Sequence, residues 1–296
     1  MKKDVFSESK KLADITKKIR DVLELWNYSE LFLPNTVEYD ESLRKGIKLT
    51  YNNDFYLTNP DVTSQIVQSY SKENDLKCFY ISDIQEGLER EIQLGVEYIG
   101  SDSLKPKVEI LNVLITILEK LDIDDFYIDI SSLKVWKEVI SGVERYKDEI
   151  FKALKRRNLS VIDDLDIKEE RKQDLWELLN LRGEKSGFKK IDELLNIIDD
   201  ERLFADLGTV RPLSYYYDII FEVYSPNLGY PIGAGGEYFV NEKPSCGFAL
   251  NLDNISKIYE LKEEDGKNVI QDDIKSAYKT ARKLVNQGKK IEVKVK

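Results

Sequence analysis

The chain has 296 residues and a formal net charge of −10, with 42% hydrophobic and 34% charged residues. This composition is typical of a soluble globular protein with one large domain and room for a smaller appendage. The acidic balance opposes non-specific binding to nucleic acid, and no apolar run is long enough to span a membrane. The first residues, "MKKDVFSESKKLADITKK", lack the apolar core of a secretory signal, so we expect a cytoplasmic protein.

The chain contains no histidine. This excludes histidine-based catalytic triads, acid–base catalysis by imidazole, and histidine metal ligands. Two cysteines, Cys78 and Cys246, lie far apart in apolar, strand-like contexts. Their setting favours two buried thiols over a disulfide, and one pair of cysteines does not make a zinc site. We expect neither a metal nor a cofactor.

The first part of the chain predicts a helix followed by an edge strand. Apolar residues recur at helical spacing over 8–26, and Ser7 is suited to cap the start of that helix. A strand-like run follows at 28–40. Pro34 lies inside this run, which indicates an edge strand or a bend.

Residues 54–71 have the pattern of a strand, a turn and a helix, with Asp61 or Thr63 near the start of the helix. Two further strands are predicted at 76–85 and 93–100, joined by a short polar turn. A strand pair of this kind is typical of an antiparallel hairpin.

The remaining pattern alternates between helical and strand-rich regions. A strongly apolar helix is predicted at 105–121 and a strand at 125–131, whereas 134–200 is helical and charged. Strand patterns return over 209–250, and the tail from Gly266 onward predicts strand, helix and strand. Strands grouped toward both ends, with helices between and around them, favour an α+β fold with a mostly antiparallel sheet.

"GAGGEY", residues 233–238, is the glycine-rich feature of the chain. It is not a phosphate loop, because no Gly-Lys-Ser or Gly-Lys-Thr follows and no helix is predicted after it. Two interpretations stay open. The glycines form a tight turn between strands, or they allow a backbone or a ligand to approach closely.

"VRPLSYYYDIIFEVY", residues 210–224, joins an arginine to three adjacent tyrosines. Arg211 could clamp a carboxylate or phosphate if it faces a cavity, or else lie at the surface or pair with a glutamate. Alternation along a strand places Tyr215 and Tyr217 on one face and Tyr216 on the other. Some of these tyrosines must therefore pack inward.

Taken in order, several segments resemble the motifs of class II aminoacyl-tRNA synthetases, and most closely those of histidyl-tRNA synthetase and its paralogues. The resemblance covers nearly all of residues 1–260. The segments are "NYSELFLPNTVE", "YLTNPDVT", "REIQLGVEYIG", "VRPLSYYYDIIFEVY", "GAGGEY" and "SCGFALNLDNI". It implies a class II synthetase-like domain over 1–262, an antiparallel sheet flanked by helices, with a helical insertion at about 134–204. Residues 263–296 resemble a truncated anticodon-binding domain.

The chain departs from the family where the family places catalytic arginines and an aspartate. The motif 2 arginine falls on Glu86 or a neighbour, the motif 3 arginine on Asn254, and the arginine of "GGRYD" on Glu237. The aspartate of "RGLDYY" falls on Ser214. Adenylation concentrates negative charge on phosphate, which arginines and magnesium must offset. We therefore expect no catalytic residues.

A synthetase-like chain without those arginines resembles the regulatory subunit of ATP phosphoribosyltransferase. That resemblance implies a non-catalytic subunit in histidine biosynthesis, which assembles with the short-form catalytic subunit. It also implies a homodimer, formed through the motif 1 helix and strand, and no binding of tRNA. A chain without histidine fits this pathway, since it can be translated when histidine is scarce.

The resemblance also implies a relic amino-acid pocket. In it, Arg211 would bind a carboxylate, Asp61 and Thr63 would meet an α-amino group, and histidine would be the ligand sensed. Alternatively, the many substitutions have filled the pocket and the role is structural. The expected ligand-binding residues are Asp61, Thr63, Gln93, Glu97, Arg211, Tyr215, Tyr216, Gly235 and Gly236.

Two other functions remain open from the sequence. The first is a divergent stand-alone ligase that adenylates a small amino acid or a carrier, which the lost arginines disfavour. The second is an orphan synthetase-like binding module with a different partner.

Overall fold

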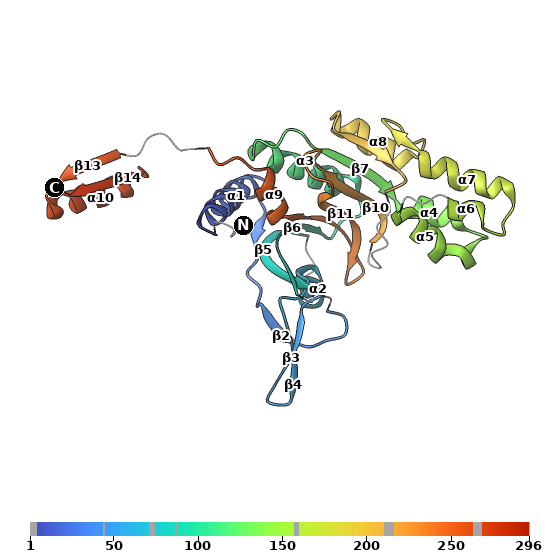
Figure 1. Ribbon diagram of the computed structural model, residues 1–296, viewed down its shortest axis with the longest axis horizontal. Helices are drawn as coiled ribbons and strands as arrows, with labels where there is room; N and C mark the ends of the chain where they lie inside the picture. The colour runs from blue at the N-terminus through green and yellow to red at the C-terminus, as the bar shows by residue number, and fades with distance from the viewer. Residues whose placement is uncertain are drawn as a thin grey trace. The chain divides into compact units, whose positions relative to one another are not determined.

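The computed structural model describes residues 5–43, 45–70, 75–86, 88–156, 160–209, 216–262 and 268–295 (Figure 1). The chain forms two compact units, Met1–Tyr259 and Glu260–Lys296.

A large sheet forms the centre of the first unit. Its strands, in the order in which they pair, are β1 (Ser29–Glu30), β5 (Leu76–Glu86), β6 (Glu89–Ile99), β12 (Lys243–Asn251), β11 (Pro231–Val240), β10 (Tyr216–Tyr224), β7 (Tyr127–Ser132), β9 (Leu203–Asp206) and β8 (Arg182–Gly183). Neighbouring strands are antiparallel, except for the parallel pairs β1–β5 and β7–β9. The predicted α+β fold with a mostly antiparallel sheet is confirmed.

Alternation along the strands gives this sheet an apolar face, which carries the main core, and a more polar face, which carries polar side chains and a smaller hydrophobic cluster that includes Tyr80 and Ile99. In β6, Leu94, Val96 and Tyr98 belong to the main hydrophobic core. Gln93 and Glu97 lie on the opposite face and line a cavity. One strand therefore contributes to both the core and the candidate site.

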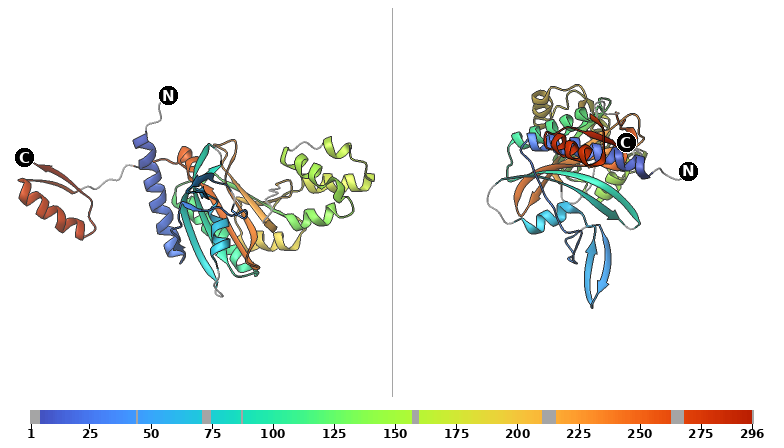
Figure 2. Two further views of the ribbon diagram at one scale, coloured as in Figure 1. Left: turned by 90° about the horizontal axis from the view of Figure 1, so that it is seen from below. Right: turned by 90° about the vertical axis from the view of Figure 1, so that its left-hand side faces the viewer.

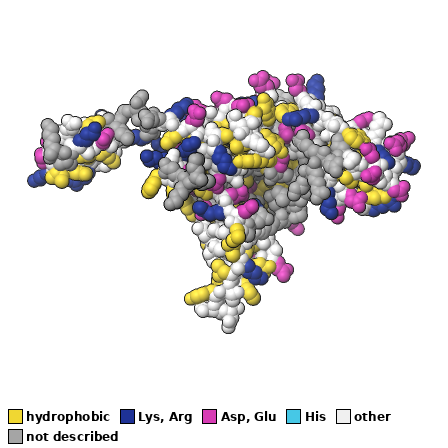
Figure 3. Space-filling view, in the orientation of Figure 1, with side chains coloured by type: hydrophobic (Ala, Val, Ile, Leu, Met, Phe, Trp, Pro, Cys, Tyr) yellow, Lys and Arg dark blue, Asp and Glu magenta, His cyan; other side chains and the backbone are white. Residues whose placement is uncertain are grey.

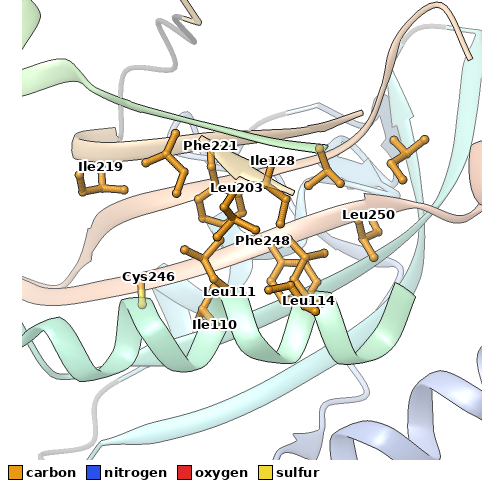
Figure 4. Packing of buried hydrophobic residues seen from close by; sticks show 14 of the residues in the cluster. Ile110, Leu111, Leu114, Ile128, Leu203, Ile219, Phe221, Cys246, Phe248 and Leu250 are labelled. Atoms are coloured by element: carbon orange, nitrogen blue, oxygen red, sulfur yellow. The ribbon is translucent and has the colours of Figure 1, made fainter. Parts of the chain in front are cut away.

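Helices cover the apolar face and complete the core. Figure 4 shows Ile110, Leu111 and Leu114 of one helix directed at Phe221 and Phe248 of the sheet. Burial of one such aliphatic side chain contributes about 1.5–3 kcal/mol relative to exposure. The helices α1 (Val5–Leu25), α3 (Leu104–Lys120), α8 (Lys189–Ile198) and α9 (Leu252–Ile258) contribute residues to this core, and so do the other helices between β7 and β9.

A small three-stranded sheet projects from the large one (Figures 1 and 2). It pairs β2 (Thr36–Glu38), β4 (Asp54–Thr58) and β3 (Ile47–Tyr51) in that order. Asn52 and Asn53 join β3 to β4 with φ values of 49° and 67°, as a two-residue hairpin turn requires. Figure 3 shows apolar side chains around this hairpin, where Tyr51 and Phe55 are exposed.

A largely helical segment connects β7 to β9. Its middle part lies beyond one end of the sheet (Figures 1 and 2), whereas its last helix, α8, packs on the apolar face of the sheet. Trp136 anchors the segment, since its buried indole N–H donates to the Leu207 carbonyl at 2.7 Å. The segment contains α4 (Leu133–Ile140), a 3₁₀ turn (Glu144–Tyr146), α5 (Lys147–Arg156), α6 (Ser160–Asp163), α7 (Glu169–Asn180) and α8. The predicted helical region is confirmed, whereas its origin as the family's insertion stays a prediction.

The second unit is a strand–helix–strand. It consists of β13 (Asn268–Asp272), α10 (Ile274–Asn286) and β14 (Ile291–Val295), with the two strands parallel. Ile270, Ala277 and Ala281 form its small core. The order of elements agrees with the sequence pattern.

Both cysteines are buried free thiols, as expected. None of the helices in the described part of the chain combines the length and apolar character of a membrane span.

Candidate ligand-binding site

A cavity of about 700 Å³ lies on the polar face of the large sheet. The strands β6, β11 and β12 and the start of α2 (Val62–Ser69) form most of its wall. Its described lining residues are Lys45, Asp61, Thr63, Glu91, Gln93, Glu97, Tyr216, Tyr230, Pro231, Ile232, Gly233, Ala234, Tyr238, Gly247, Phe248, Ala249, Asn251 and Asn254.

The first turn of α2 brings two side chains to this cavity. Asp61 is the N-cap residue, and its carboxylate accepts from Ser64 N at 3.1 Å and from Ser64 Oγ at 2.6 Å. Capping of this kind is worth about 1 kcal/mol and fixes where the helix begins. Thr63 lies two residues after Asp61, and its hydroxyl donates to Glu97 Oε1 at 2.9 Å.

Glu97 is a carboxyl group buried at the bottom of the cavity, with 3% of its surface exposed. Its oxygens accept hydrogen bonds from Thr63 and from the Tyr238 hydroxyl. Burial raises the pKa of Glu97 to about 8, against the lowering effect of those two bonds. Gly247 makes room for the carboxyl, since a Cβ there would lie 2.0 Å from Glu97 Oε2.

Tyr80 extends this polar cluster beneath the cavity. Gln93 Nε2 donates to the Tyr80 hydroxyl at 2.9 Å, and that hydroxyl lies 3.4 Å from Thr63 Oγ1. Gln93, Tyr80, Thr63, Glu97 and Tyr238 therefore form one connected chain of side chains.

The structure brings together most of the residues expected from the sequence. Asp61, Thr63, Gln93, Glu97 and Tyr216 all line the cavity. Arg211 and Tyr215 lie outside the described residues.

Gly235 and Gly236 do not line the cavity, although both belong to the expected set. A Cβ on Gly235 would meet Phe221 in the main core, and one on Gly236 would meet the Ile219 carbonyl. Gly233 and Ala234 of the same strand line the cavity instead.

Tyr80 and Tyr238 are the two members of this polar cluster that sequence reasoning missed. Tyr238 adjoins Glu237 in β11, so alternation along that strand could have placed it on the cavity face. Tyr80 carried no such signal, because its importance depends on side chains from three separate segments.

The end of the cavity away from Glu97 is lined by polar side chains of both charges. Asn251 Nδ2 donates to Glu91 Oε2 at 2.7 Å, and Lys45 Nζ lies 3.8 Å from Glu91. Asn254 accepts from Lys257 at 2.9 Å. Lys45 is the only lysine or arginine among the described lining residues, so this end offers little to offset the charge of a triphosphate.

Glu237 lies on the opposite face of the sheet from the cavity. Its carboxylate is fully buried and contacts Lys107 of α3 at 2.8 Å and Lys190 of α8 at 2.8 Å. It also accepts from the Ile219 backbone N–H at 2.9 Å. Glu237 therefore joins β11 to two helices and adds no charge to the cavity.

The chemistry of the site is that of recognition by hydrogen bonds. A buried carboxyl, two phenols, a threonine and a glutamine can bind a small polar molecule with several donors and acceptors. Among the described residues, no group of three or more acidic or cysteine side chains is placed to hold a metal ion.

Comparison with known proteins identifies related chains. The family model described as Histidyl-tRNA synthetase matches residues 4–255. A protein named ATP phosphoribosyltransferase regulatory subunit, from Caldanaerobacter subterraneus subsp. tengcongensis, is 29% identical over 295 residues. That alignment covers 82% of this chain and 77% of the relative.

Solved structures show the same fold. The crystal structure of an ATP phosphoribosyltransferase regulatory subunit/histidyl-tRNA synthetase from Bacillus halodurans C matches with a TM-score of 0.79 at 21% identity, covering 97% of this chain and 89% of that one. The ATP phosphoribosyl transferase (HisG:HisZ) complex from Thermotoga maritima contains a chain that matches with a TM-score of 0.69 at 17% identity, covering 80% and 96%.

Proposed function

Because the chain belongs to the histidyl-tRNA synthetase family, we propose that it is the non-catalytic regulatory subunit of an ATP phosphoribosyltransferase in histidine biosynthesis. The observation that carries the proposal is its similarity, over 82% of the chain, to a relative named for that role. The short-form catalytic transferase is then its partner, and tRNA is not.

The polar end of the cavity supports a non-catalytic role. Adenylation needs positive groups around the reacting phosphate, and arginines supply them in the family. Here Lys45 is the only cation among the described lining residues, and it lies beside Glu91. Asn254 stands where the resemblance places the motif 3 arginine. This arrangement favours a pocket that binds without activating.

The deep end of the cavity supports the sensing of histidine. Glu97 and Tyr238 offer hydrogen-bond partners for an imidazole ring. By resemblance, Asp61 and Thr63 would meet the α-amino group. By resemblance, Arg211 would hold the carboxylate.

The edge of the sheet supports a homodimer. Among the described strands, β1 is the outermost on its side of the sheet. Leu25 and Phe32 flank it with 87% and 85% of their surfaces exposed. Large apolar side chains beside a free strand edge are typical of an interface.

Light scattering after size exclusion tests the proposal. The chain is run alone and mixed with the short catalytic transferase from the same source. We expect a joint peak with a mass above that of either component, and histidine can then be titrated into the complex. Separate peaks would overturn the proposal.

The alternative ligase function has its own measurement. A magnesium-dependent exchange of pyrophosphate into ATP, stimulated by an amino acid, would establish adenylation. We expect no exchange above background, with a full-length histidyl-tRNA synthetase as the positive control.

A further inference from the structure

Tyr80 of β5 lies directly beneath the expected amino-acid end of the cavity. It is 2% exposed and packs among apolar residues that include Val62 and Ile66 of α2. Its ring lies against Gly95 of the neighbouring strand, where a Cβ would stand 2.1 Å from Tyr80 Cζ. Gly95 thus leaves room for the tyrosine ring, and the ring brings a single hydroxyl to the polar cluster.

That hydroxyl has two polar neighbours. Thr63 Oγ1 lies 3.4 Å away, and either oxygen can be the donor in this contact. Tyr80 accepts from Gln93 Nε2 at 2.9 Å. Burial raises the pKa of the Tyr80 phenol well above its ordinary value, so its proton remains available.

This direction decides which atom Gln93 offers to a ligand. A glutamine amide has a donor end and an acceptor end, and either end can face a cavity. With Nε2 held by Tyr80, the carbonyl Oε1 is the group left for the cavity that Gln93 lines. A carbonyl acceptor suits an ammonium group and does not suit a carboxylate.

We infer that Tyr80 is a positioning residue: it orients the Gln93 amide so that the cavity selects ligands that carry an amino group. This inference rests on the proposed binding of histidine. It concerns selection between ligands, which a merely structural tyrosine would not affect.

The test compares Tyr80→Phe with the wild-type chain by calorimetric titration. The ligands are histidine and 3-(imidazol-4-yl)propionate, which lacks the amino group. The wild-type chain is expected to prefer histidine. The variant should lose about tenfold or more of that preference, because the released Gln93 amide no longer holds its carbonyl toward the charged ammonium group. Its affinity for the propionate should change less than about threefold.

Tyr98→Phe is the matched control. Tyr98 is also buried in the sheet, but it belongs to the core on the opposite face, so its variant should keep the preference for histidine. Equal weakening of both ligands in Tyr80→Phe, or an unchanged preference, would overturn the inference. Equal binding of both ligands by the wild-type chain would overturn it as well.

If the wild-type chain binds neither ligand, histidine sensing is wrong, and the positioning role is then decided in the ligand-free protein. The side-chain amide signal of Gln93 is assigned by its loss in Gln93→Met. We expect its hydrogen exchange to become at least about tenfold faster in Tyr80→Phe, since the held donor is released. Unchanged exchange would contradict the positioning role.

Discussion

Glu97 shows how burial sets the chemistry of a single side chain. Its carboxyl lies among hydroxyl donors beneath the cavity, and its pKa is raised from 4.5 to about 8. The unfolded chain loses this proton at lower pH than the folded chain does. Glu97 therefore contributes stability at low pH, and that contribution is lost as the pH rises from about 4.5 through about 8.

Glu97→Gln tests this pH dependence. Glutamine cannot ionise, so we expect the variant to gain stability relative to the wild-type chain as the pH rises from 5 to 8.5. The gain should approach about 1.4 kcal/mol per pH unit at most. Urea unfolding followed by tryptophan fluorescence measures it. The exposed Glu193→Gln serves as the control and should show no such trend. A difference that stays constant with pH would contradict the assignment.

Gly247 is a second residue with a defined role, because it leaves room for the Glu97 carboxyl. A Cβ at this position would lie 2.0 Å from Glu97 Oε2 and 2.5 Å from the Val96 carbonyl, which is backbone and cannot move away easily. We expect Gly247→Ala to cost about 1–3 kcal/mol of stability and to abolish histidine binding. Thermal unfolding and calorimetry measure the two effects.

Gly229→Ala is the matched control for this substitution. A Cβ on Gly229 would meet no atom within 4 Å, so stability should stay within about 0.5 kcal/mol. A Gly247→Ala chain as stable as Gly229→Ala would show that the close approach to Glu97 is not needed.

At the scale of elements, β11 connects the cavity to the helices on the other face. Tyr238 donates to Glu97 on the cavity side. Its neighbour Glu237 binds Lys107 of α3 and Lys190 of α8 on the other side. Two adjacent residues thus have unrelated partners, because side chains alternate across a strand.

Lys107→Met tests the importance of that ionic contact. Lys107 and Glu237 are 4% and 1% exposed and lie 2.8 Å apart. Loss of one partner of a buried ion pair costs about 3–5 kcal/mol when the other charge is left unpaired, and here Lys190, 2.8 Å from Glu237, will offset part of that cost. We expect a clear drop in the urea midpoint. Lys105→Met, an exposed lysine on the same helix, should change little, and equal effects would contradict the proposed contribution.

The small sheet contains a strand that the local sequence pattern did not predict. The sequence predicts a strand ending near residue 58 but none at 47–51, which the structure folds as β3. In exposed strands of this kind, apolar and polar residues alternate only weakly, and few of the side chains enter a core. Their pairing depends on the Asn52–Asn53 turn, and that signal is short.

At the scale of the whole molecule, the proposed dimer makes a direct prediction. Phe32 lies beside β1 with its ring exposed. We expect Phe32→Asp to convert a dimer into a monomer, because a charge placed in an apolar interface is strongly unfavourable. Analytical ultracentrifugation measures the mass. Leu88→Asp, at an exposed turn elsewhere, should leave the dimer intact. A dimeric Phe32→Asp chain would place the interface on another surface.

The sequence by itself determined the order of most elements, the mixed α+β class and five of the residues that line the cavity. These follow from periodicity and from short motifs, which are local properties of the chain. Gln93 and Glu97 were predictable on the same face of the sheet because they are four residues apart on one strand.

Only the tertiary structure decided how those residues are used. It placed Glu237 among the helices, excluded Gly235 and Gly236 from the cavity wall, and added Tyr80 and Tyr238 to the cluster. The physical reason is that the direction of a side chain, its burial and its hydrogen-bond partners depend on strands far apart in the sequence. The raised pKa of Glu97 likewise exists only after β6, β11, β12 and α2 have closed around the carboxyl.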